Sequence, residues 1–293
     1  MGSCVASRRS QAVEPQPPPR MLGLEEELWE KCGGLEFDSV LGSGAVVLMD
    51  AEWMVRRART GGVLEPRQAL PPTAFMPHSA VKATTPEFMF LPLLHIACIS
   101  HCWLQANHPD PHGHNLRVLG RALQLLLTDY FVDFKGRWAV FMDFCCIHQN
   151  CRDREGIPQQ CTYQRLEDSG SFEDDAIGRF EPEHALFKEA LGSLGRFYSH
   201  PATVVFMLTQ FPDDYDDAAK YTRLGNTEQY FNRGWCFCES SWAMLTKDFR
   251  CLVDLGHSTG AETCYYGDYG RADSLVTACA AGRRAPVLPD AFD

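Results

Sequence analysis

The sequence predicts an α/β protein in which a parallel β-sheet carries helices on both faces. Short apolar runs alternate along the chain with segments whose apolar residues recur at helical spacing, and this alternation is typical of a parallel sheet. The runs hold almost no polar residues, as expected for strands that are covered on both faces. With 293 residues, of which 45% are hydrophobic, the chain is long enough to bury a substantial core.

Charge and cysteine content narrow the functional classes. A net charge of -11 argues against a nucleic-acid-binding surface, which would need clustered Lys and Arg. The 13 cysteines are an odd number with no secretory signal ahead of them, so reduced thiols in a cytoplasmic protein are the simpler interpretation. No apolar run approaches the roughly 20 residues that a membrane-spanning helix needs.

The N-terminus, residues 1–20, is polar and proline-rich, which predicts disorder. Gly2 follows the initiator Met, Cys4 lies close to it, and two arginines come next. An acyl chain on Gly2, a second on Cys4 and the basic patch could together anchor the chain to the inner face of a membrane. The strict acylation pattern has Ser or Thr at position 6, where this chain has Ala6. A disordered start without an anchor is therefore the alternative.

Residues 21–87 are expected to form an irregular segment that packs on the main domain. A short helix is expected in LGLEEELWEKC and a strand in AVVLMDAEWM. From Arg56 to Thr85, Gly and Pro are frequent and periodic signals are few.

The main domain is expected at 88–256. Its first strand is FLPLLHIACIS, which ends at Ser100, and the helix that follows has Asn115 as its expected N-cap. RWAVFMDFCC is the second strand, and an acidic insertion at 152–182 is long enough to be a functional loop. A helix that begins near Pro182 then leads to the third strand, ATVVFMLT. YFNRGWCFCESSWAML is the next helix, FRCLVDLG is the fourth strand, and residues 257–293 are a C-terminal extension.

Polar side chains follow the first two strands, where ligands bind in parallel sheets. The first strand ends in Ser100, His101 and Trp103, and the second ends at Asp143. The alternative is structural, with Asp143 capping a turn and His101 satisfied at the edge of the domain.

Glu239 is a single carboxylate in an otherwise apolar helix. If the helix begins after Gly234, Trp235 and Trp242 lie on its core-facing stripe together with Cys238 and Leu245, and Glu239 stands beside both rings. Partial desolvation there would raise the pKa of the carboxyl group toward the range of a working acid or base. The alternative is that Glu239 pairs with Arg233 and orients the start of the helix.

A metal site is not predicted. Cys145, Cys146, His148 and Cys151 lie close together in the sequence, but they contain no paired CxxC motif, and three of them fall where a strand should end.

Four motifs, in order between Leu91 and Leu255, resemble those of heterokaryon-incompatibility (HET) domains. Asp143 to Gln149, DFCCIHQ, resembles the D-x-x-C-I-N-Q signature of that family, with His148 in place of Asn. Ser100 to Trp103 is similar to its Ser-aromatic-x-Trp motif, and FKEALGSLGRFYSHPATVVFM is similar to its helix that ends in a tyrosine before a strand. Arg233 to Glu239, RGWCFCE, resembles its R-G-W-x-x-x-E element.

HET domains are themselves similar to Toll/interleukin-1 receptor (TIR) domains, so the resemblance implies a flavodoxin-like fold. In many TIR domains W-C-x-x-E supplies a glutamate that cleaves the nicotinamide-ribose bond of NAD, and Trp235, Cys236 and Glu239 match that motif. The resemblance therefore implies an NAD glycohydrolase in a defence or stress response, with Glu239 catalytic. Ser100, His101, Trp103, Asp143 and Trp235 would bind NAD as the substrate rather than as a cofactor.

The resemblance is incomplete. The opening strand motif of TIR domains differs from this chain, whose first strand ends in SHCW and is followed by the loop LQANHPDPHGHN. The insertion has no counterpart in the family. Many members of both families assemble with themselves or with other signalling proteins without catalysis, so a non-enzymatic interaction module of the same fold is the alternative.

Overall fold

The computed structural model describes residues 19–84, 93–105, 108–128, 137–149, 181–213, 215, 225–266 and 273–282. Gly2, Cys4 and residues 152–180 of the insertion lie outside this part of the chain, so the lipid-anchor and loop predictions stay predictions. None of the helices in the described residues is long and apolar enough to cross a bilayer.

A six-stranded sheet in the described residues has the order β2-β1-β4-β3-β5-β6. Four neighbouring strands of this sheet are parallel: β3 (Ile96–His101), β4 (Ala139–Phe141), β5 (Val204–Leu208) and β6 (Leu252–Asp254). They are the four strands that the apolar runs predict. Of the two remaining strands, β1 (Leu48–Asp50) is antiparallel to β4, and β2 (Phe75–Met76) is antiparallel to β1. The α/β class is thus confirmed, but the sheet is mixed and the prediction of a purely parallel sheet is wrong.

The antiparallel edge arises from the segment at 21–87, which contributes to the sheet as well as packing on it. The side chain of Asp50, at the end of β1, accepts a hydrogen bond from the Trp53 amide at 2.9 Å and so caps helix α3 (Ala51–Arg59). The segment is also more regular than its Gly and Pro content predicts. Its other elements are α1 (Pro19–Lys31), α2 (Leu35–Gly42), α4 (His78–Lys82) and the short 3₁₀ helices η1 (Arg67–Ala69) and η2 (Pro72–Ala74).

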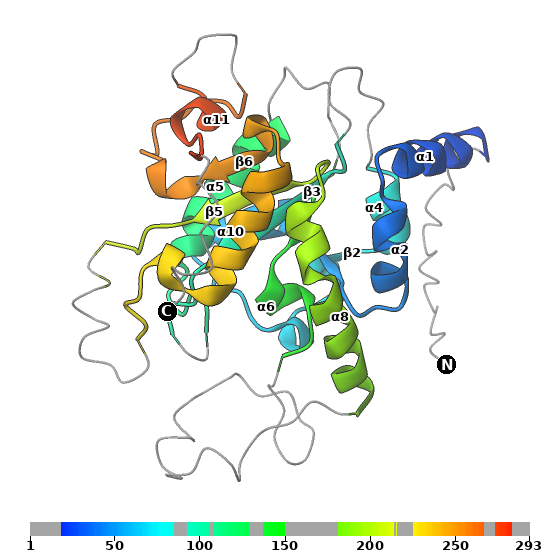
Figure 1. Cartoon of the computed structure of the whole chain (residues 1–293), viewed down its shortest axis with the longest axis horizontal. Helices are drawn as coiled ribbons and strands as arrows, with labels where there is room; N and C mark the ends of the chain where they lie inside the picture. Colours follow the sequence, from blue (N-terminus) through cyan, green and yellow to red (C-terminus); the bar gives the residue numbers. More distant parts are fainter. Residues whose placement is uncertain are drawn as a thin grey trace, which may run out of the picture.

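Helices cover both faces of the sheet, and every residue of β3 to β6 is buried. On one face α3 packs on α5 (His114–Thr128); on the other, α8 (Glu181–Ser199) packs on α10 (Gly234–Thr246). Figure 1 shows α8 and α10 in front of the sheet and α5 behind it. Asp110, rather than the predicted Asn115, caps α5: its carboxylate accepts hydrogen bonds from the amides of His114 and Leu116, both at 2.8 Å.

The remaining elements are short. They are α6 (Asp143–Cys146), η3 (Tyr230–Asn232), η4 (Phe249–Cys251), η5 (Leu255–His257) and α11 (Leu275–Ala278). Part of the C-terminal extension belongs to the core, since Tyr265, Leu275 and Cys279 are buried and the Asp254 amide donates to the Cys279 carbonyl.

Candidate functional site

The carboxyl ends of β3 and β4 bring three of the predicted residues together. Cys98 of β3 pairs with Phe141 of β4, which places His101 and Asp143 at the same edge of the sheet. His101 Nε2 lies 3.6 Å from Asp143 Oδ1, and Trp103 Nε1 donates to Asp143 Oδ2 at 3.2 Å. The side chain of Asp143 is 27% exposed whereas that of His101 is 2% exposed. Solvent therefore reaches this edge at Asp143.

Helix α10 brings Glu239 to the same edge. Ser100, the penultimate residue of β3, donates from Oγ to Glu239 Oε2 at 2.6 Å. Glu239 is only 7% exposed, so its carboxyl group faces the end of the strand and not bulk solvent. Ser100, Asp143 and Glu239 therefore lie close together at the carboxyl edge of the sheet.

Two tyrosines complete the surroundings of Glu239. The Tyr230 hydroxyl hydrogen-bonds Ser100 Oγ. The Tyr198 hydroxyl donates to the Ile99 carbonyl at 3.0 Å and lies close enough to the Glu239 carboxyl group to affect its pKa. Neither tyrosine is among the site residues that the sequence predicts. Tyr198 could have been found, because the HET-like pattern ends its helix in a tyrosine, whereas Tyr230 lies before the R-G-W motif with no signal of its own.

Burial raises the pKa of Glu239 to about 8, from an ordinary value of 4.5. The negative charge of Asp143 acts in the same direction, because it disfavours a second anion at this edge. The hydrogen bond from Ser100 opposes the shift because it favours the ionised form, and the neighbouring Tyr198 hydroxyl acts in the same direction. Near neutral pH the carboxyl group is therefore mostly protonated, and a nearby cation would favour its ionisation.

Arg233 does not pair with Glu239. Its guanidinium group donates to the backbone carbonyls of Trp103 at 2.5 Å, Glu228 at 2.7 Å and Asn226 at 2.8 Å. Arg233 therefore holds the loop after β3 against the segment that leads into α10. The alternative interpretation of Glu239 as an ion-pair partner of Arg233 is wrong.

The predicted core-facing stripe of α10 is wrong. The buried residues lie one position further along the helix than the predicted ones. Trp235 is 61% exposed and Leu245 is 72% exposed, whereas Cys236, Ser240 and Ala243 are buried with Glu239. Small side chains line the buried face because α10 lies close to β3 and α8, where the Trp242 ring packs against Gly195. Trp235, a predicted substrate-binding residue, thus faces solvent instead of standing beside the carboxyl group.

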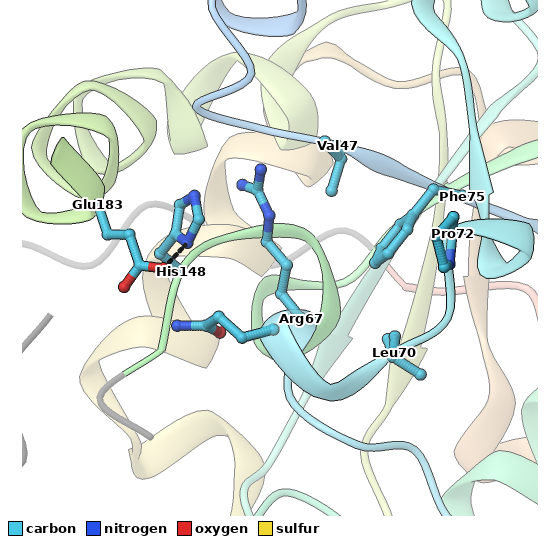
Figure 2. A pocket seen from close by; sticks show the side chains of 8 residues that line it. Val47, Arg67, Leu70, Pro72, Phe75, His148 and Glu183 are labelled. Atoms are coloured by element: carbon cyan, nitrogen blue, oxygen red, sulfur yellow. Dashed lines mark ion pairs between the residues drawn. The ribbon is translucent and has the colours of Figure 1, made fainter. Parts of the chain in front are cut away.

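A cavity of about 350 Å³ lies away from Glu239, between the N-terminal segment and α8. Figure 2 shows its apolar wall, formed by Val47, Leu70, Pro72 and Phe75, opposite Arg67 and the ion pair of His148 and Glu183 at 3.6 Å. Arg67 donates to the carbonyls of residues 44, 45 and 146, so it joins the turn between α2 and β1 to the end of α6. His148, which replaces the Asn of the HET signature, thus belongs to this cavity.

In the described residues no group of three or more His, Cys, Asp or Glu side chains is arranged to hold a metal ion. Cys145 and Cys146 are fully buried beside β4, where burial raises the pKa of both thiols, and Cys151 lies outside the described residues.

No protein-family model, curated protein or solved structure matches the chain.

Proposed function

We propose that the chain is a HET/TIR-like domain that hydrolyses the nicotinamide-ribose bond of NAD, with Glu239 as the catalytic carboxylate. The observation that carries the proposal is the Ser100–Glu239 hydrogen bond of 2.6 Å at the carboxyl end of β3, with Asp143 at the same edge. The strand order supports it. Numbered along the chain, the four parallel strands have the order 2-1-3-4, as in flavodoxin-like folds, and ligands bind where such an order reverses.

The chemistry suits a carboxyl group of this kind. Cleavage of a glycosidic C–N bond passes through an oxocarbenium-like state, which an adjacent carboxylate stabilises electrostatically. The nicotinamide ring of NAD carries a positive charge, and a cation close to Glu239 lowers its pKa and favours the ionised form. Ser100 would then hold the carboxylate in place through the hydrogen bond that it already donates.

Release of nicotinamide from NAD by the purified full chain tests the proposal. Glu239→Gln preserves the shape of the side chain and removes its charge, so turnover should fall by at least about 100-fold, as for the loss of one electrostatic catalytic group. Glu27→Gln, at an exposed position on α1, is the matched control and should retain full turnover. Undiminished turnover in Glu239→Gln would contradict the proposal.

An interaction module of the same fold is the second candidate, and one observation favours it. Trp235, Leu245 and Phe249 are 61%, 72% and 65% exposed along α10 and just after it. If these side chains form one apolar patch, that patch is a candidate surface for contact with other proteins, including further copies of the same chain. If NAD is not cleaved and Trp235→Ser with Leu245→Ser reduces self-association in sedimentation velocity, this candidate replaces the first.

A further inference from the structure

Two cysteines from different elements lie in contact beside Glu239. Cys102 follows β3, Cys236 is in the first turn of α10, and their sulfur atoms are 3.9 Å apart. Cys236 Sγ also lies 3.4 Å from the carbonyl oxygen of His101. We propose that Cys102 and Cys236 are a redox-modification site, at which a hydroperoxide such as hydrogen peroxide converts the two thiols to a reversible disulfide.

The distance between the sulfur atoms makes the reaction feasible without unfolding. A disulfide bond is about 2.05 Å long, so the sulfur atoms must approach by roughly 1.9 Å. The first turn of α10 begins at Gly234, which has open space where a side chain would be, and it carries no side-chain cap at Arg233. A small displacement of this turn toward β3 brings the atoms together.

The thiols differ in reactivity, and the difference assigns their roles. The hydrogen bond from Cys236, together with the charge of Arg233, lowers the pKa of Cys102. Burial raises the thiol pKa of several other cysteines in the described chain, namely Cys32, Cys98, Cys145, Cys146, Cys251 and Cys279. Because the thiolate is the nucleophile, Cys102 reacts first although it is only 5% exposed.

The reaction has two steps. The Cys102 thiolate attacks one oxygen atom of hydrogen peroxide, breaks the O–O bond and becomes a sulfenic acid, and the released hydroxide takes up a proton to give water. The Cys236 sulfur then attacks the sulfenic sulfur, and the hydroxyl group leaves as a second molecule of water with the Cys236 proton. In total two thiols lose two electrons and two protons, and one peroxide is reduced to two molecules of water.

The disulfide would change the edge of the sheet where Glu239 lies. Cys102 is two residues after Ser100, and Cys236 is three residues before Glu239. The bond would tie the start of α10 to the end of β3 and end the contact of the Cys236 thiol with the His101 carbonyl. Oxidation would thus alter the position of Glu239 relative to Ser100. The proposal concerns the thiol pair and holds whether or not the chain cleaves NAD.

Peptide mapping of the full chain by mass spectrometry tests the proposal. After brief treatment with a few equivalents of hydrogen peroxide and alkylation of the remaining thiols, most molecules should carry a Cys102–Cys236 cross-link that dithiothreitol removes. In Cys236→Ser no cross-link can form, and dimedone should label Cys102 as the sulfenic acid. Cys238→Ser, two positions further along the same helix, is the matched control and should leave the cross-link unchanged.

Two results would overturn the proposal. One is that Cys102 stays reduced while other cysteines are oxidised, and the other is that the main cross-link joins a different pair. Far-ultraviolet circular dichroism of each variant before treatment shows whether it is folded. If Cys236→Ser does not fold, Cys236→Ala takes its place, because it removes the thiol without adding a polar group.

Discussion

Replacement of Glu239 by Gln should stabilise the protein, and the gain should grow with pH. Burial and the charge of Asp143 raise the pKa of Glu239 from 4.5 to about 8. Below pH 4.5 the group is neutral in both the folded and the unfolded chain, so it carries no ionisation penalty. Between pH 4.5 and 8 only the unfolded chain ionises, so the wild type loses stability as the pH rises. The amide of the substituted side chain has no proton to lose in this range, so the variant escapes this loss.

The size of the effect follows from the pKa shift. One pKa unit corresponds to about 1.4 kcal/mol, so a shift of roughly 3.5 units sets an upper value near 5 kcal/mol above pH 8. About 3 kcal/mol of it is present at pH 7. The substitution also changes the free energy of unfolding by an amount that does not depend on pH, because the Gln amide replaces the carboxyl group in its contacts with Ser100 and Tyr198. The test is therefore how the difference in free energy of unfolding between the variant and the wild type changes with pH.

Urea unfolding at intervals from pH 4.5 to 9, followed by circular dichroism, measures this difference. The free energy of unfolding of Glu239→Gln minus that of the wild type should rise by several kcal/mol and level off above pH 8. Glu27→Gln should give a difference that stays near zero over the same range, because its side chain is exposed. A flat profile for Glu239→Gln would refute the reasoning, since it would show that the protein compensates the charge of the buried carboxylate.

Three further predictions follow from the same structure. Asp143→Asn removes a like charge, so the pKa of Glu239, followed by the ¹³C NMR shift of its carboxyl carbon, should fall, and an unchanged value would show that burial alone sets it. The double variant Trp235→Ser, Leu245→Ser should change the free energy of unfolding in urea by less than about 1 kcal/mol, because both side chains are exposed. A loss above about 3 kcal/mol would show that both side chains are buried, as the sequence predicts. Burial lowers the pKa of Lys247 from 10.5 to about 8, so between pH 8 and 10.5 the unfolded chain binds more protons than the folded chain. Urea unfolding extended to pH 10.5 should show that wild-type stability rises with pH relative to Lys247→Met by up to about 3 kcal/mol, and a difference independent of pH would contradict this prediction.

The parallel strands were predictable because each is covered on both faces. A fully buried strand must be apolar along its whole length, and Ala97 to Ile99 in β3 and Val204 to Phe206 in β5 satisfy this condition. The antiparallel edge was predictable only in part, because the strand that the sequence predicts in AVVLMDAEWM contains β1 whereas no pattern predicts β2. β2 has two residues and β1 has three, so neither is long enough to show a period, and their pairing depends on the position of β4.

The site was predictable in part for a related reason. Ser100 and Asp143 end apolar strands, and topology brings such ends together. The face of α10 was not predictable from hydrophobicity, because the helix turns Glu239 and Ser240 toward the sheet and leaves Trp235 in solvent. The usual rule for an amphipathic helix places large apolar side chains inward. It fails where most of the buried side chains must be small or polar.

A second buried ionisable side chain, at the far end of α10, explains how the helix holds that orientation. Lys247 Nζ donates to the carbonyls of His200 and Thr203, which precede β5 at the amino edge of the sheet. Thr203 lies four residues before Met207, which pairs with Ser100, so these two contacts of α10 are about 13 Å apart along the strands. Glu239 and Lys247 are eight residues apart, or about 12 Å along a helix. The two lengths match, so α10 spans the sheet from its carboxyl edge to its amino edge with one polar contact at each end. A shift of the helix by one residue would break both contacts, and the position of Glu239 beside Ser100 therefore depends on Lys247 as well as on the residues around it.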